Sequence, residues 1–427
     1  MIISLRRALR SKLLAETAVY GGLNVVRALI PVLLVPVLTR YLTPEDYGMV
    51  VLFEFSRNLG VQIFGLGTVS AVRRRFFDPE RVEFGRYFSS ALLANAFGFV
   101  VILLVIGLCT ALGWGLPPLA MWALAPVIAG QVILALFLAV LQLHHRPVTF
   151  GLVMIANTLA NLGLSVVFVV PLGWGWYGRV WAIVAAALGS AVLAVLLTWR
   201  RVGLARPDFR WMRDALNYGL PIIPNGLLSK LAAFADRVLV AALVSVSVAG
   251  VYAAAYQFAM VITMSVQSLA YAWTPWLFER LKREDAAADR SIVKATYASC
   301  AALTLIAVAA IFAVHYFAPW IVGRSFHGAT LYTPWLLTSA LLRGMSRVIS
   351  TIILYSERTA SLSLITVSVL VVNVLALVVL VPWVGPVGAA QASCLASFVG
   401  LVVTWRLASR FRPLPWLLRR HPAESID

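Results

Sequence analysis

The sequence predicts an all-α polytopic membrane protein with twelve transmembrane helices, and three observations lead to that prediction. First, 61% of the 427 residues are hydrophobic, only 12% are charged, and the mean hydropathy is +0.90. Soluble domains carry about a quarter charged residues, so the bilayer must be the solvent for this much apolar surface. Second, apolar segments long enough to cross a bilayer recur along the whole chain. Third, Lys and Arg gather on one side of the predicted membrane.

The apolar segments set the number of spans. A transmembrane helix needs about 20 apolar residues. Short connections rich in Pro and Gly separate the segments, as at 113–118, 171–178 and 382–388. The twelve spans are expected near residues 14–39, 47–70, 87–111, 118–141, 149–171, 179–199, 217–242, 249–275, 292–316, 331–354, 360–382 and 386–407.

The positive charges set the orientation. Six of the 35 Lys and Arg residues lie well inside predicted spans, and 26 lie in the segments and at the helix ends on one side of the membrane. The other side holds three: Arg40, Arg179 and Arg324. Cytoplasmic segments are enriched in Lys and Arg, so both termini are expected in the cytoplasm. The net charge of +18 is therefore explained by topology, and no nucleic-acid partner is expected.

An internal repeat predicts two lobes. Arg146 precedes Asn161 by the same interval that separates Arg358 from Asn373, and a proline and a glycine-rich turn follow each asparagine. Segment 43–53 also aligns with segment 247–258, with Gly48 opposite Gly250. Six spans preserve the orientation of the chain, so the repeat predicts parallel six-helix lobes. Their expected bounds are 1–206 and 207–427.

Ionisable residues inside the spans predict a binding site, because each costs at least about 2.5–3.5 kcal/mol at mid-bilayer. Internal ion pairs such as Glu54 with Arg57, or side chains that reach the interface from helix ends, are the structural alternatives. Two acids cannot neutralise six cations, however, and the surplus favours an anion site. The cationic candidates are Arg27, Arg57, Lys230, Arg237, Arg343 and Arg347, and the acids are Glu54 and Asp236.

Missing motifs exclude several enzyme classes. None of the four lysines follows a glycine, so there is no phosphate-binding GxxxxGK loop. The three cysteines and five histidines have no metal-ligand spacing, and no HExxH or GxSxG motif occurs. We therefore expect no cofactor, no metal and no catalytic activity. Glu54 and Asp236 are the interior acids that could carry a coupling proton.

Three segments resemble a known family. They are LLVPVLTRYLTPEDYGMVVLFE (33–54), YGLPIIPNGLLSKLAAFADRVLVAALVSVSVAGVYAAAYQF (218–258) and NVLALVVLVPWVGPVGAAQAS (373–393). Together they resemble the bacterial polysaccharide-export flippases, which are the O-antigen and exopolysaccharide translocases of the multidrug/oligosaccharidyl-lipid/polysaccharide exporter superfamily. The similarity extends over essentially the whole chain.

This resemblance implies two six-helix lobes around a central cavity in the bacterial cytoplasmic (inner) membrane. It further implies alternating access that moves an undecaprenyl-diphosphate-linked oligosaccharide to the outer leaflet. The partners would be the lipid-linked substrate, membrane lipids and a separate polysaccharide polymerase. In relatives, cations of spans 1, 2 and 7 line the cavity, and Arg27, Arg57, Lys230 and Arg237 occupy those spans here.

Other functions stay open. A cation-coupled drug exporter of the same superfamily should favour acidic cavity residues, whereas this interior is basic. Peptidoglycan-precursor flippases often carry more than twelve spans. A membrane-embedded polysaccharide polymerase or glycosyltransferase, from a different functional class, usually needs a large outer loop, and the longest one expected here is 317–330.

Overall fold

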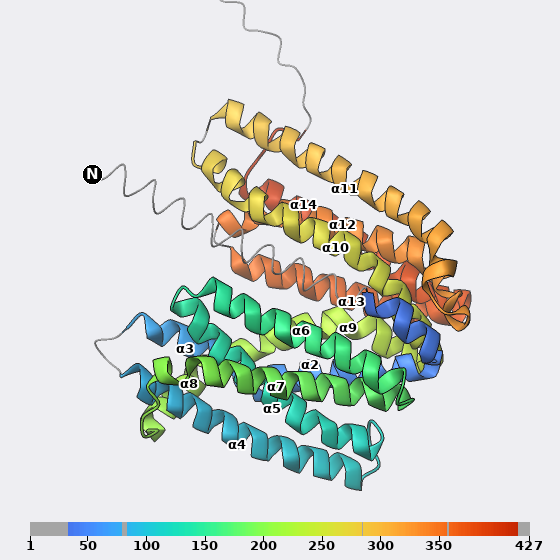
Figure 1. Ribbon diagram of the computed structural model, residues 1–427. Helices are drawn as coiled ribbons and strands as arrows, with labels where there is room; N and C mark the ends of the chain where they lie inside the picture. The colour runs from blue at the N-terminus through green and yellow to red at the C-terminus, as the bar shows by residue number, and fades with distance from the viewer. Residues whose placement is uncertain (1–32, 79–82, 284, 357, 417–427) are drawn as a thin grey trace, which may run out of the picture. The chain divides into compact units, whose positions relative to one another are not determined.

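The structure is a computed structural model that describes residues 33–78, 83–283, 285–356 and 358–416. Within these ranges the secondary structure is helical, and no strand occurs (Figure 1). Residues 33–41 are helical as well. The helices are α2 (Pro44–Phe64), α3 (Thr68–Phe76), α4 (Phe84–Ala111), α5 (Pro118–Leu143), α6 (Pro147–Val169), α7 (Gly175–Val202), α8 (Phe209–Gly219), η1 (Leu220–Ile222), α9 (Ile223–Leu243), α10 (Val246–Leu281), α11 (Ala286–Ile321), η2 (Arg324–Phe326), α12 (Ala329–Tyr355), α13 (Thr359–Val384) and α14 (Val387–Phe411).

Most predicted spans coincide with a helix. In the described part of the chain, nine helices are long and apolar enough to cross a bilayer, and the bent pair α2–α3 adds a tenth. The predicted span 217–242 corresponds to α9, which is 21 residues long but carries Lys230, Asp236 and Arg237. The first predicted span, 14–39, lies mainly outside the described residues. The all-α membrane fold is confirmed, and helices stand at eleven of the twelve expected positions.

The second predicted span, 47–70, is not one straight helix. It begins at Pro44, where Thr43 and Asp46 cap each other's backbone N–H groups. It bends by 46° between α2 and α3. The bend follows from the turn after Phe64, in which Leu66 and Gly67 both adopt positive φ angles of 51° and 63°. The span expected at 47–70 is therefore a bent pair of helices.

The described chain forms two compact units. The first contains the described residues up to Ala254 together with Pro319–Ala329, and the second contains Ala255–Ala318 and the described residues from Thr330 onward. Pro319–Ala329 joins the first unit because the Gly323 N–H donates to Thr39 Oγ1 at 3.1 Å and Phe326 packs edge-on against Tyr47. The predicted lobes, 1–206 and 207–427, are a different division and stay a prediction.

The core of the first unit is built around α5, which is buried along most of its length. Its Phe137 packs edge-on against Phe88 of α4, with ring centroids 5.1 Å apart. The outward faces of α4 and α6 are apolar and exposed, as at Leu104 and Leu152. An apolar exposed face on an apolar helix is typical of contact with lipid.

Two helical hairpins reproduce the predicted repeat. In the α6–α7 hairpin, a Cβ on Gly178 would lie 2.8 Å from the carbonyl oxygen of Phe168. In the α13–α14 hairpin, a Cβ on Gly388 would lie 2.5 Å from the carbonyl oxygen of Leu380. Glycine therefore lets the second helix approach the first at corresponding places, which accounts for the two glycine-rich turns of the sequence repeat.

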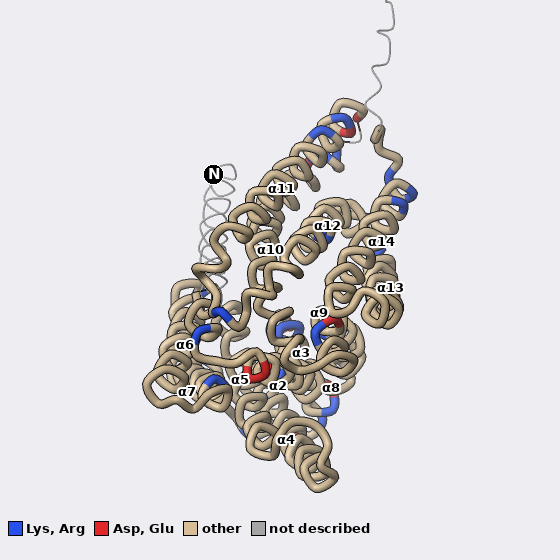
Figure 2. The backbone as a smooth tube through the Cα atoms, turned by 90° about the vertical axis from the view of Figure 1, so that its right-hand side faces the viewer, with Lys and Arg blue, Asp and Glu red and all other residues tan. Residues whose placement is uncertain are grey.

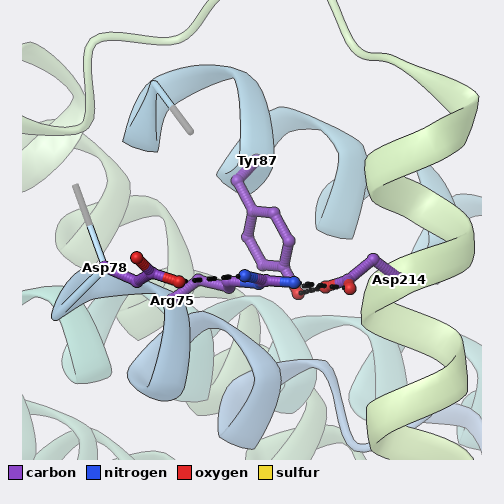
Figure 3. A network of polar contacts seen from close by, with 4 residues as sticks. All are labelled: Arg75, Asp78, Tyr87 and Asp214. Carbon is purple, nitrogen blue, oxygen red and sulfur yellow. Dashed lines mark hydrogen bonds and ion pairs between the residues drawn. The ribbon is translucent and has the colours of Figure 1, made fainter. Parts of the chain in front are cut away.

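The short helix α8 is fixed to the first unit by a polar network (Figure 3). Arg75 of α3 donates to both oxygens of Asp214 of α8, at 3.1 and 2.6 Å, and pairs with Asp78 at 3.2 Å. The Tyr87 hydroxyl of α4 donates to the same carboxylate at 3.0 Å. Partial burial raises the pKa of Asp214, but hydrogen bonds from Arg75 and Tyr87 and the charges of Arg75 and Arg74 outweigh it, so this pKa lies below its ordinary value.

Backbone contacts reinforce that attachment of α8. A Cβ on Gly219, the last residue of α8, would lie 2.1 Å from the carbonyl oxygen of Leu66. Just before α8, Ser90 accepts a hydrogen bond from the Asp208 N–H at 2.9 Å. The segment between the two predicted lobes is therefore a packed element of the first unit.

Candidate functional site

The cationic candidates are distributed over both units. Arg57 lies on α2, and Lys230 and Arg237 lie on α9, all in the first unit. Arg343 and Arg347 lie on α12 in the second unit. Arg27 lies outside the described residues. Figure 2 shows long stretches of α11 and α13 without charge, whereas α9 and α12 carry basic residues.

Helices α2 and α9 pack against each other and bring two of the candidates to the same level. The rings of Phe55 and Phe234 lie 5.8 Å apart, and further along Gly226 contacts the side chain of Gln62. The two helices are therefore antiparallel. Arg57 and Lys230 both lie in the stretch between these two contacts, and both side chains are partly exposed. Two cations that are far apart in the sequence thus stand at the same level of two packed helices.

Asp236 is the most enclosed candidate, with 7% of its surface exposed. One carboxylate oxygen accepts from the Tyr252 hydroxyl at 2.9 Å, and the other accepts from the Arg237 N–H at 2.9 Å. The guanidinium of Arg237 lies over the ring of Phe234, 5.0 Å from its centroid. Because a buried carboxylate is costly, donors such as Tyr252 are needed to hold it.

Glu54 has a partner that the sequence analysis missed. The charge count placed Arg179 with the outer loops, but it lies near the N-terminal end of α7 and is only 8% exposed. Its Nη2 lies 3.4 Å from Glu54 Oε1. Its Nη1 donates to Asn161 Oδ1 at 2.5 Å and to Ser165 Oγ at 2.7 Å, and both of these residues belong to α6.

A signal for Arg179 was present in the sequence. It directly follows Gly178, the glycine that allows α7 to approach α6, on the side of the predicted membrane that holds few cations. An isolated cation at the end of an apolar helix is stronger evidence for a specific partner than a cation in a basic loop. The charge count treated it as a loop residue because the predicted span began at Arg179 itself.

In the second unit, α12 presents a stripe of polar residues. Arg343 Nη1 donates to Ser339 Oγ at 2.6 Å and to Ser397 Oγ of α14 at 3.3 Å. Its Nη2 donates to the Tyr256 hydroxyl of α10 at 3.5 Å. Arg347, one turn further on, is exposed. Among the described residues, the hydrogen-bond acceptors found for Arg343 are hydroxyls.

A metal site requires a group of ligand side chains. Across the ranges that the structure describes, no three His, Cys, Asp or Glu side chains are grouped so that they could hold a metal ion. The three cysteines, Cys109, Cys300 and Cys394, are free thiols.

The fold is that of a membrane transporter. The structure resembles an inward-facing multidrug resistance MATE family transporter of the MOP superfamily, with a TM-score of 0.69 and 17% identity over 90% of this chain and 96% of the other. It also resembles a mutant of the Vibrio cholerae MATE transporter VcmN, with a TM-score of 0.59 and 13% identity over 95% of this chain and 97% of the other. At these identities the likeness shows the fold alone.

The sequence comparison identifies the family. The profile of the polysaccharide biosynthesis protein family matches residues 13–281, and the chain belongs to that family. An uncharacterized membrane protein of Haemophilus influenzae is 24% identical over 283 residues, which is 64% of this chain and 66% of that protein. The resemblance found in the sequence is confirmed: this is a membrane protein of the polysaccharide biosynthesis protein family, and its fold is that of the MATE transporters.

Proposed function

We propose that the protein is a flippase that moves an undecaprenyl-diphosphate-linked oligosaccharide from the inner to the outer leaflet of the bacterial cytoplasmic membrane. The family match supports a role in polysaccharide biosynthesis, and the fold supports transport by alternating access. The cargo would serve cell-surface polysaccharide synthesis, such as O-antigen or exopolysaccharide, with a separate polymerase as the downstream partner.

The observation that carries the proposal is the pair of packed helices α2 and α9, which hold Arg57, Lys230 and Arg237 within the apolar part of the chain. Interior cations outnumber interior acids, and the two acids already accept from Arg179 and Tyr252. The net charge of this region is therefore positive. A diphosphate is the part of the proposed cargo that needs such a charge.

Arg and Lys would play different parts in holding a diphosphate. Arg grips phosphate oxygens with two parallel N–H groups, whereas Lys acts as a point charge on a flexible stem. One close charge pair is worth on the order of 4 kcal/mol at an effective dielectric near 20, before desolvation. Arg343 and Arg347 give the second unit a positive surface of its own, and we propose that it also serves the anionic cargo.

A series at Lys230 tests this assignment by complementation of surface polysaccharide in a strain that lacks the gene. Lys230→Arg should retain much of the export, Lys230→Ala should lose roughly tenfold to a hundredfold, since about 1.4 kcal/mol is one factor of ten, and Lys230→Glu should abolish it. Lys282→Glu is the matched control, because Lys282 is exposed beyond the end of α10 and should tolerate the reversal.

Protein abundance in the membrane decides between a binding role and a structural role. If Lys230 were structural, export in each variant would follow the amount of inserted protein. Normal export at normal abundance in both Lys230→Glu and Arg237→Glu would contradict a cationic cargo site.

A drug exporter is the second candidate, and the likeness to multidrug MATE transporters favours it. The positive interior argues against it, because an organic cation would be repelled. Drug resistance that depends on this gene, with unchanged surface polysaccharide in its absence, would favour the exporter.

A further inference from the structure

The buried arginine of the first unit sits among oxygen ligands. Arg179 reaches a carboxylate oxygen of Glu54, the amide oxygen of Asn161 and the hydroxyl of Ser165, from two other helices. Carboxylate, amide and hydroxyl oxygens are the donors that hard cations prefer. In the first unit, the guanidinium of Arg179 occupies the place that a cation would take among these oxygens.

A guanidinium differs from a mobile ion in two ways. It is always charged, so it cannot release a proton at any physiological pH. It is also tied to α7, so it cannot exchange with the solvent. Glu54 therefore has a permanent counter-charge, and removing that charge would leave a partly buried carboxylate uncompensated, which is costly.

The internal repeat offers a comparison within the same chain. Gly48 aligns with Gly250, and six residues further along each segment Glu54 is opposite Tyr256. Tyr256 also receives a guanidinium, that of Arg343, which comes from α12 of the second unit. A guanidinium therefore contacts each of the two aligned residues, from helices that the repeat does not pair, and of the two residues Glu54 is the one that supplies a negative charge.

We propose that Arg179 is a tethered cation that permanently fills the polar site formed by Glu54, Asn161 and Ser165. Glu54 then holds this guanidinium in place of an exchangeable alkali cation during the transport cycle. This narrows the ion coupling that the proposed function leaves open, and it does not depend on the identity of the cargo.

The proposal predicts that removing Arg179 uncovers a cation site. The full-length protein, purified in detergent, is melted in sodium chloride, lithium chloride or choline chloride at equal ionic strength. The change in melting temperature between choline chloride and sodium or lithium chloride should be the same for the wild type and for Glu54→Gln. Arg179→Ala should gain a rise in melting temperature with sodium or lithium, and Arg179→Ala combined with Glu54→Gln should not.

Two results would overturn the proposal. One is a sodium or lithium response in the wild type that Glu54→Gln removes, because the site would then be exchangeable. The other is an Arg179→Ala variant that folds and shows no gain over the wild type.

If Arg179→Ala folds poorly, the amount of each variant that accumulates in the membrane provides a second test. The added Glu54→Gln substitution should then restore accumulation, because it removes the uncompensated charge. Equal loss in the single and the double variant would show that Arg179 acts through packing, which would contradict the proposal.

Discussion

Tyr252 and Asp236 show how single side chains make an acid tolerable inside an apolar helix. The Asp236 carboxylate is almost completely buried, and it accepts hydrogen bonds from the Tyr252 hydroxyl and the backbone N–H of Arg237. With Glu54 held by Arg179, Asp236 is the remaining interior acid that we propose as the ion-coupling residue. Its place on α9, one residue from Arg237, would put ion exchange next to the proposed cargo site.

Substitutions at this pair should separate coupling from folding. Asp236→Asn keeps an acceptor for Tyr252 but cannot carry a proton, so export should be lost while the protein still accumulates. Tyr252→Phe removes one charge-assisted hydrogen bond, worth about 1.5–3 kcal/mol, and should lower the melting temperature. The measurements are complementation and thermal melting, and full export by Asp236→Asn would refute a coupling role.

At the same scale, sequence reasoning found the charged residues but not their partners. Residue type and helical spacing were sufficient to select Lys230, Asp236 and Arg237. The contact between Arg179 and Glu54 joins α7 to α2 across 125 positions in the sequence. No local pattern encodes such a contact, so it needed the fold.

Helix α8 and the bend after α2 form one structural element. The bend places Leu66 and Gly67 against Gly219, while Arg75 and Tyr87 hold Asp214. Hydropathy alone predicted a single span over 47–70, because a bend between two apolar helices leaves composition unchanged. Gly67, the glycine that adopts a positive φ in the bend, was visible in the sequence, but its effect depends on its tertiary neighbour Gly219.

A pair of glycine substitutions tests how tightly α8 is packed. Gly219→Ala would place a methyl group 2.1 Å from the Leu66 carbonyl oxygen, and we expect a loss of about 1–3 kcal/mol from overpacking. Gly189→Ala is the control, since a Cβ there meets nothing within 4 Å. Thermal melting of both variants is the measurement, and equal melting temperatures would contradict close packing of α8.

The depressed pKa of Asp214 predicts how acid affects this element. A carboxyl with a folded pKa below its unfolded value, about 3.9, stabilises the protein above that value and loses the contribution as pH falls through the folded pKa. In the wild type, the melting temperature should therefore decrease as the pH is lowered below about 4. Asp214→Asn should start lower at neutral pH and lose less on acidification; an identical pH profile would exclude this contribution.

At the scale of the whole molecule, the sequence predicts the fold class better than it predicts individual contacts. The lengths of the apolar segments and the distribution of Lys and Arg are properties of the entire chain, and they determine the fold class. Composition and twelve apolar segments sufficed for an all-α membrane protein, and the comparisons confirm a MATE-like fold and a polysaccharide biosynthesis family. How the units move, and which sugar is carried, depend on shape complementarity that no motif encodes.

The predicted orientation remains a testable property of the whole chain. Reporter fusions after residues 145, 208 and 286 should all report a cytoplasmic position, because the basic residues flank these points. Alkaline phosphatase and fluorescent protein fusions are complementary readouts. Any one of these positions reading as external would invalidate the twelve-span topology from that point on.

Direct flipping of a defined lipid tests the central claim. The purified protein is reconstituted into proteoliposomes with an undecaprenyl-diphosphate-linked oligosaccharide, and exposure of the sugar on the opposite leaflet is followed with a membrane-impermeant lectin or enzyme. We predict protein-dependent flipping by the wild type and by Lys282→Glu, and none by Lys230→Glu at equal reconstitution. Flipping by Lys230→Glu at the wild-type rate, or no flipping by a wild-type protein that restores surface polysaccharide in cells, would contradict the account.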